Sequence, residues 1–298
     1  MSAKETVLHM KTGILSRYRE TGRPVSLGFF GGTFTAVNKQ EMLFFLEEAV
    51  SLKNSGAVSH IRCSTRPDCI DGKTLTILKH YQLDMIELGI QSFDHKTLEL
   101  SGRGYSSEKC LQSCRMIKNY DFELGIQLLP GLPGSGYSSF SADIRTTVDV
   151  RPDAVRLYPC LVLKDTHLAW RMNMGSYRPW GLEDTVETMS QALLRLWMNK
   201  IQVIRIGLTP EPRLIKNTLA GPWHPSLGSI CRSKALKSYI FQHLKGMDQK
   251  PEEIFVPEKY VSDFWGFRKM NQVEYAQKGI TREVVSVWKE EFFSISYA

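Results

Sequence analysis

Short apolar runs that alternate with amphipathic stretches are the feature that most limits how this chain of 298 residues folds. The runs are rich in β-branched residues and several end in Gly or Pro, which is typical of strands. The expected strands are Val25–Phe30, Val58–Cys63, Asp84–Gly89, Glu123–Leu128, Ala154–Tyr158 and Val203–Gly207. Helical patterns between them cover Lys39–Asn54, Ser107–Asn119, Ser138–Val150 and Leu182–Asn199. This alternation predicts parallel βα units, and hence an α/β fold that is either a barrel or an open doubly wound sheet.

Polar residues and glycines collect where the expected strands end. In chain order these are Gly31, Gly32 and Thr33, then Ser64 to Asp68, then Gln91, and then Pro130 at the start of a PGLPG segment. Barrel folds carry their chemistry on the loops that follow the carboxyl ends of the strands. This concentration of polar residues and glycines at the strand ends therefore predicts a site for a small molecule.

Each of these features has an ordinary structural interpretation beside the functional one. Gly31 and Gly32 let a ligand approach the backbone, because neither has a side chain, but taken alone such a pair more often makes a tight turn. Arg66 and Asp68 suit a carboxylate or a ribose and suit a surface salt bridge equally well. Glu87 lies in an apolar strand, so we expect it to meet an arginine or a ligand.

Two amides lie at comparable ends of expected strands. Gln91 and Gln127 carry donors and acceptors that suit an adenosine or a ribose, although amides with satisfied hydrogen bonds are common in protein cores.

Composition excludes some classes of protein and leaves others open. No apolar run approaches the roughly 18 residues of a membrane span, and the N-terminus mixes charges in a way that no signal peptide does, so we expect a cytoplasmic protein. Six cysteines in a chain of this length indicate buried free thiols rather than a disulfide framework. The net charge of +7 is compatible with an RNA partner, although the basic residues are scattered.

Five segments together resemble the radical SAM superfamily, and within it the catalytic subunit of Elongator. They are FFGGTFTA (Phe29–Ala36), STRPD (Ser64–Asp68), IELGIQSFDHKTLELSGRGYS (Ile86–Ser106), GIQLLPGLPG (Gly125–Gly134) and DAVRLYPCLVLKDTHLAWRMNMGSYRPW (Asp153–Trp180). The resemblance runs from Val25 to Leu208 and implies a partial (β/α) barrel that binds S-adenosylmethionine (SAM), with the GGTF segment at the methionyl end. The cofactor-binding residues expected from it are Gly31, Gly32, Thr33, Ser64, Arg66, Asp68, Glu87, Gln91, Gln127 and Pro130.

The chain departs from this family at its cysteines. Family members begin with a strand and a CxxxCxxC loop, whose three thiolates bind a [4Fe-4S] cluster. Here Cys110 and Cys114 lie one turn apart in a helical pattern, and the third ligand would fall on Ile117, which cannot bind iron. We therefore expect no metal site, a barrel without its first strand, and a truncated form of a radical SAM enzyme that is inactive by itself.

Three functions remain open on the sequence alone. The intact enzyme would generate a deoxyadenosyl radical, with tRNA favoured as substrate by the Elongator resemblance. The alternative is a non-catalytic remnant that binds SAM, RNA or a partner protein, and a barrel hydrolase that uses Asp68 and Glu87 ranks last. We expect a core over residues 1–220, a small appendage over residues 221–298 without an acetyltransferase domain, and association through the exposed edge at Val25–Phe30.

Overall fold

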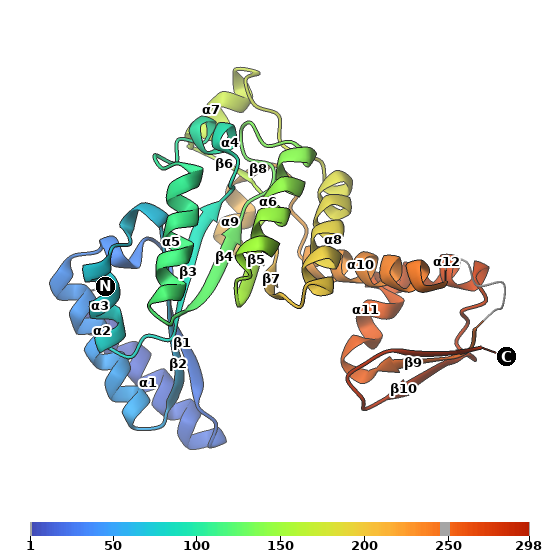
Figure 1. Ribbon diagram of the computed structural model, residues 1–298, viewed down its shortest axis with the longest axis horizontal. Coiled ribbons are helices and arrows are strands. Elements are labelled where there is room, and N and C mark those ends of the chain that lie inside the picture. The colour runs from blue at the N-terminus through green and yellow to red at the C-terminus, as the bar shows by residue number, and fades with distance from the viewer. Residues whose placement is uncertain (1, 245–250, 298) are drawn as a thin grey trace. The chain divides into compact units, whose positions relative to one another are not determined.

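The computed structural model describes residues 2–244 and 251–297, and its largest sheet has six strands (Figure 1). The strands are β1 (Val25–Phe29), β2 (Val58–Thr65), β3 (Met85–Gln91), β4 (Glu123–Leu128), β5 (Ala154–Leu157) and β7 (Gln202–Ile206). They lie in the order β1-β2-β3-β4-β5-β7, and the pairs from β1 to β4 are parallel. All six expected strands are present, and the predicted α/β partial barrel is confirmed.

The chain divides into two compact units, of which the first comprises Met1–Leu129 and Pro133–Arg156. Its helices are α1 (Ala3–Thr21), α2 (Lys39–Asn54), α3 (Gly72–His80), α4 (His95–Leu100), α5 (Ser107–Asn119) and α6 (Tyr137–Val150), with single turns η1 (Phe34–Ala36) and η2 (Pro67–Cys69). A capping box begins α1, because Ser2 Oγ accepts from Glu5 N (3.2 Å) while Glu5 Oε2 accepts from Ser2 N (2.7 Å). Gly22 ends that helix in the left-handed conformation.

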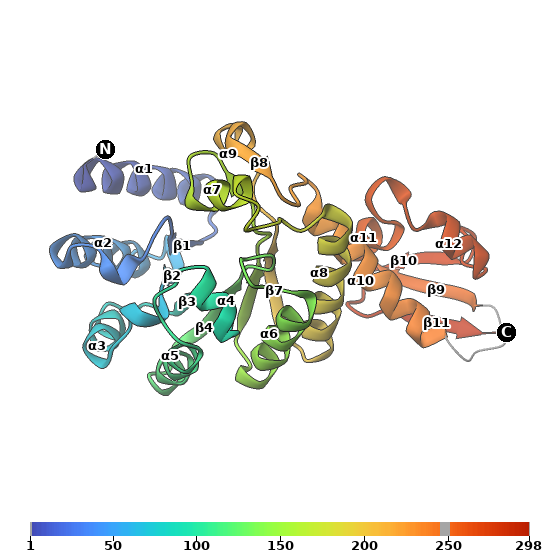
Figure 2. The same ribbon diagram turned by 90° about the horizontal axis from the view of Figure 1, so that it is seen from above.

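The two faces of the sheet in this unit differ in chemistry. Helices α2, α3, α5 and α6 flank one face of strands β1 to β5 (Figure 2). In β2 the buried Ile61 and Cys63 alternate with the partly exposed His60 and Arg62. Because successive strand residues point to opposite faces, the apolar residues pack under the helices and the polar residues lie on the other face. Of the expected site residues, Ser64, Glu87 and Gln127 lie in these strands and on that other face.

The second unit comprises Pro130–Leu132 and Leu157–Ala298. Besides β7 it holds β6 (Val162–Leu163), α7 (His167–Asn173), α8 (Leu182–Met198), α9 (Pro212–Asn217), β8 (Thr218–Ala220), α10 (Leu227–Leu244), β9 (Pro251–Pro257), η3 (Glu258–Tyr260), α11 (Val261–Trp265), η4 (Phe267–Lys269), α12 (Gln272–Gln277), β10 (Val285–Trp288) and β11 (Ser294–Tyr297). Strands β6 and β8 pair antiparallel, and a second small sheet has the order β10-β9-β11.

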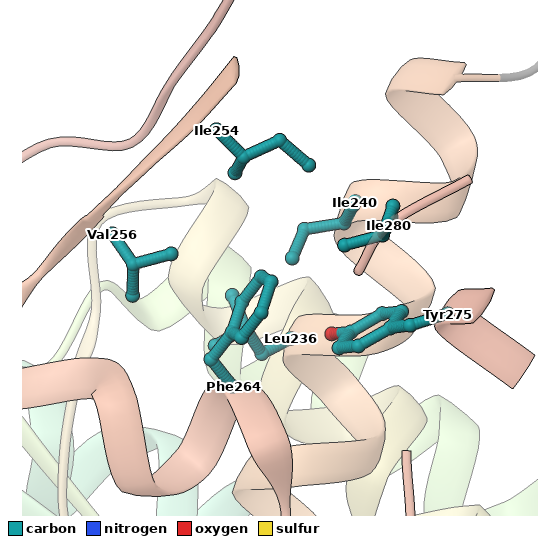
Figure 3. Close-up of a cluster of buried hydrophobic side chains, with 7 residues drawn as sticks. All are labelled: Leu236, Ile240, Ile254, Val256, Phe264, Tyr275 and Ile280. Carbon is teal, nitrogen blue, oxygen red and sulfur yellow. The ribbon is translucent and has the colours of Figure 1, made fainter. Parts of the chain in front are cut away.

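A separate hydrophobic cluster stabilises the C-terminal elements (Figure 3). Seven buried side chains from α10, β9, α11, α12 and the residues that follow form it: Leu236, Ile240, Ile254, Val256, Phe264, Tyr275 and Ile280. The sequence predicted a small appendage over residues 221–298, and its boundary with the core stays a prediction. Among the helices that the structure describes, none is both long enough and apolar enough to cross a lipid bilayer.

Candidate functional site

A buried ion pair lies at the centre of the polar face. Glu87, in the middle of β3, is 1% exposed and accepts a hydrogen bond from Arg156 Nη2 to Oε1 (3.0 Å) and another from Arg156 Nε. Gln127 Nε2 donates to Glu87 Oε2 (3.3 Å), and Arg62 Nη1 lies 3.6 Å from Oε1. The expected pairing of Glu87 with an arginine is therefore confirmed. We call the face that these residues share with Gly28, Phe30, Ser64 and Gly125 the inner face.

Two glycines make room for the larger side chains of the inner face. Gly125 lies opposite Glu87 in the sheet, and a Cβ at Gly125 would lie 2.6 Å from Glu87 Cγ. A Cβ at Gly28 would lie 2.2 Å from the ring of Phe30. That ring folds back over β1, where the guanidinium carbons of Arg62 and Arg156 lie 5.4 Å and 5.0 Å from its centroid. A Cβ at Gly125 would thus displace the buried Glu87 and its backbone, whereas a Cβ at Gly28 would displace only the half-exposed ring of Phe30.

The Gly31-Gly32 loop leaves open space beside the end of β1. Gly31 has φ +105°, a conformation that side chains other than glycine rarely adopt. The φ of Gly32 is not in this positive range, and no atom lies within 4 Å of a Cβ built there. Packing within the described chain therefore does not explain glycine at position 32, whereas close approach of a ligand would. Thr33 follows and precedes η1 without making a capping hydrogen bond.

Ser64 and Gln127 extend the polar network toward the ends of β2 and β4. Gln127 Nε2 donates to Ser64 Oγ (3.2 Å) as well as to Glu87. No hydrogen bond within the described residues uses the Ser64 hydroxyl proton or the Gln127 carbonyl oxygen. These two groups are available to a polar ligand.

Arg66 and Asp68 are paired with each other. Arg66 Nε and Nη2 donate to the two carboxylate oxygens of Asp68 (2.9 Å and 2.7 Å), and Nη2 also donates to the carbonyl of Arg103 (2.9 Å). These hydrogen bonds hold the pKa of Asp68 below its ordinary value. The geometry fits the salt-bridge interpretation, and the role of the pair in holding a cofactor stays a prediction.

Arg103 and Tyr105 organise the end of β3, and the sequence reasoning missed both. Arg103 Nη2 and the Tyr105 hydroxyl each donate to the carbonyl of Gly89 (3.0 Å and 2.8 Å). Gln91 lies in the left-handed region with φ +72°, and its Nε2 would lie 2.9 Å from a Cβ at Gly89. The side chain of Gln91 therefore turns back over the strand that carries it.

One expected residue belongs to the other unit. Pro130 lies in the second unit, where its carbonyl accepts from Cys160 N (3.1 Å) and the neighbouring carbonyl of Gly131 accepts from the Tyr177 hydroxyl (2.6 Å). The remaining nine expected residues lie in the first unit. Whether Pro130 takes part in binding stays a prediction.

The thiols of this chain do not fit a [4Fe-4S] cluster. Cys110 and Cys114 lie in α5 and are buried, as the helical pattern predicts, and burial raises the pKa of each to about 12. Among the six cysteines only Cys69 is partly exposed. Cluster ligands are thiolates, whereas a buried thiol with a raised pKa stays protonated near neutral pH.

Comparison with known proteins places the chain in a family. The model of the radical SAM superfamily matches residues 14–146, and that of the radical SAM C-terminal domain matches residues 152–237. The two matches follow one another and together cover most of the chain. The chain therefore belongs to the radical SAM superfamily, as the sequence resemblance implied.

The relatives within this superfamily include Elongator proteins. The tRNA uridine(34) acetyltransferase of Methanocaldococcus infernus is 27% identical over 216 residues, which are 64% of this chain and 40% of that protein. Mouse Elongator complex protein 3 is 26% identical over 200 residues, 59% of this chain and 36% of that protein. The chain thus spans about two fifths of the length of these curated relatives.

A solved structure supports the same fold. Archaeal Elp3 from Methanocaldococcus infernus, with an N-terminal deletion, superimposes with a TM-score of 0.64 at 23% identity, covering 79% of this chain and 58% of that one. At this identity the likeness shows the fold alone.

Proposed function

We propose that this chain is the SAM-binding core of a radical SAM enzyme, with SAM on the inner face beside the Gly31-Gly32 loop. The observation that carries the proposal is the loop itself, since packing does not account for Gly32 and the neighbouring polar groups are free to bind. Membership of a superfamily whose shared cofactor is SAM supplies the ligand.

Five of the ten expected residues have a definite part in this proposal. Gly31 and Gly32 let the methionyl end of SAM lie against the backbone. Ser64 and Gln127 offer a hydroxyl donor and a carbonyl acceptor to it. Glu87 already accepts three hydrogen bonds from Arg156 and Gln127, so its part is to position these two side chains.

We further propose that the chain of 298 residues, by itself, leaves SAM intact. In this family a [4Fe-4S] cluster supplies the electron that cleaves SAM to a deoxyadenosyl radical. The buried thiols described above support the absence of cleavage, which is the non-catalytic alternative. Where cluster thiolates are supplied, tRNA is the favoured substrate, since relatives are named as acting on tRNA and the chain carries a net charge of +7.

Calorimetric titration with SAM tests the binding proposal. The substitution Gly32→Val adds a branched side chain to the open space, and Gly13→Val adds the same side chain to an exposed turn of α1 where no atom lies within 4 Å of a Cβ. We expect saturable binding that Gly32→Val weakens at least about ten-fold, because the branched side chain would fill the space proposed for the ligand, while Gly13→Val leaves it unchanged. Absence of binding by the native chain, or equal binding by both variants, would refute the proposal.

Anaerobic reconstitution tests the second part. We expect the native chain to form no four-iron centre and no deoxyadenosine on reduction. About one four-iron centre per chain together with deoxyadenosine would contradict the proposal and would make the chain an active enzyme.

A further inference from the structure

Arg62 makes no hydrogen bond within the part of the chain that the structure describes. Its Nε is buried and has no partner, and its nearest carboxylate oxygen, Glu87 Oε1, lies 3.6 Å from Nη1, beyond hydrogen-bond length. The side chain is only 27% exposed, so water reaches little of it. A guanidinium carries N–H donors that cannot be deprotonated, and burying them without acceptors is costly.

The surroundings of Arg62 leave it as surplus positive charge. Glu87 already accepts two hydrogen bonds from Arg156 and one from Gln127. Two guanidinium groups therefore face one carboxylate, and the ring of Phe30, which lies beside both, carries no charge. A buried ion cluster with an unmatched cation is stabilised when an anion joins it.

The position of Arg62 limits where such an anion lies. Arg62 is the direct neighbour of Gly28 in the sheet, and it lies two residues before Ser64 on the same side of β2. The ring of Phe30, which precedes Gly31 and is 49% exposed, borders it. An anion held by Arg62 thus lies on the inner face, next to the Gly31-Gly32 loop.

We propose that Arg62 is an oxyanion-binding residue of the inner face, which takes a carboxylate or phosphate oxygen of the bound molecule. A guanidinium fits both groups through two parallel N–H donors. The carboxylate source is the methionyl end of SAM, and the phosphate source is a nucleotide substrate. The inference extends the proposed function at the same face, and its phosphate arm does not depend on SAM binding.

The test compares Arg62→Met with a matched control, Arg145→Met, in the full chain. Arg145 is exposed on α6, where it donates to Ser141 Oγ (3.3 Å), so both substitutions remove one guanidinium. The probes are SAM, methylthioadenosine (which lacks the carboxylate) and inorganic phosphate. The readouts are titration calorimetry and the side-chain Nε–H resonance of Arg62, assigned by its loss in Arg62→Met.

Each outcome decides the proposal. A roughly ten-fold loss of SAM affinity in Arg62→Met, with methylthioadenosine unaffected, supports the carboxylate source. A phosphate-induced shift of the Arg62 resonance, with SAM affinity unaffected, supports the phosphate source. Two results overturn the proposal. In the first, neither SAM nor phosphate moves the Arg62 resonance, and Arg62→Met and Arg145→Met bind SAM equally. In the second, the native chain does not bind SAM and phosphate does not move the Arg62 resonance.

Thermal unfolding separates this role from a structural one. Arg62 makes no hydrogen bond within the described residues and only a long ion pair with Glu87, so replacing it by an apolar side chain of similar length should leave the melting temperature equal to or above that of Arg145→Met. A melting temperature several degrees lower would make Arg62 a structural residue and overturn the proposal.

Discussion

Replacing Gly125 by alanine tests whether the inner face is built around Glu87. A Cβ at this position would lie 2.6 Å from Glu87 Cγ and 3.2 Å from both Cα and Cβ of the same residue. Non-bonded carbon atoms prefer a separation of roughly 3.5–4.0 Å. Glu87 must therefore move by about 1 Å, and because its Cα is also too close, the backbone of β3 must move with it.

The magnitude follows from what holds Glu87 in place. Overpacking in a buried site costs about 1–3 kcal/mol, and breaking a buried ion pair outright costs about 3–5 kcal/mol. The displacement strains the Glu87–Arg156 pair without removing either partner, so only part of the second cost applies. Alanine also regains about 0.5–1 kcal/mol relative to glycine within a strand. We expect Gly125→Ala to lower the free energy of unfolding by about 2–4 kcal/mol.

Urea unfolding followed by far-ultraviolet circular dichroism measures this change. The control is Gly13→Ala in α1, where a Cβ meets no atom within 4 Å and where alanine should raise stability by about 0.5–1 kcal/mol. A loss below about 0.5 kcal/mol for Gly125→Ala would refute the reasoning, since that is the size of an ordinary surface substitution. An equal loss in a Glu87→Ala background would also refute it, because the Cγ responsible for the clash is then absent.

Two further predictions concern a buried carboxyl and the thiols. Asp143 accepts from Ser92 Oγ (2.8 Å) and Phe93 N (2.7 Å), and burial raises its pKa from 3.8 to about 6. The carboxyl of Asp143 thus binds its proton more tightly in the folded chain than in the unfolded chain. Its contribution to the stability of the folded state is therefore largest at pH 4 and below, where Asp143 is protonated, and is lost as the pH rises through 6 and the carboxyl ionises. As the pH rises between these limits, the free energy of unfolding of Asp143→Asn should increase by up to about 3 kcal/mol relative to that of the native chain. A difference between the two free energies of unfolding that does not change with pH would contradict this. In thiol titration of the folded chain, Cys69 should react first and Cys69→Ser should abolish the fast phase, because the other five cysteines are buried; two or more fast thiols would argue against the buried assignment.

The barrel strands were predictable because their signal is local. Glu123–Leu128 has the predicted bounds, and the other five strands differ from their predictions by at most two residues at either end. Each strand is a short segment rich in β-branched and other apolar residues, and the turn residues that follow mark its end.

The C-terminal sheet was not predictable for a physical reason. Strand β9 (PEEIFVP) begins and ends with proline and carries two glutamates, and β10 and β11 have four residues each. None of these segments reads as a strand by its own sequence. They are held by pairing with β9 and by the cluster in Figure 3, whose members come from residues far apart in the chain.

The site was predictable only in part. The need of Glu87 for a cation follows from its apolar neighbours, but its partner Arg156 lies 69 residues away and is set by the arrangement of β3 and β5 in the sheet. Arg62 was missed, although a signal was present. In the run VSHIRCST the polar His60, Arg62 and Ser64 alternate with apolar residues, a period of two that places them on one face.

Strand β1 has only β2 as a neighbour among the described strands, so association through its free edge stays a prediction.

The ligand binding proposed above and the radical chemistry of the family depend on residues in different environments, so the two can be tested separately. The inner face is polar, and Arg62 Nε on it has no hydrogen-bond partner among the described residues, which suits this face to the binding proposed above. Five of the six thiols are buried, four of them with pKa values raised to about 12 or beyond, and these thiols are unsuited to holding iron. A binding measurement on the isolated chain therefore reports on the inner face alone. If SAM cleavage then appears only after cluster thiolates are added, the cleavage is assigned to those thiolates, because SAM binding has been measured beforehand.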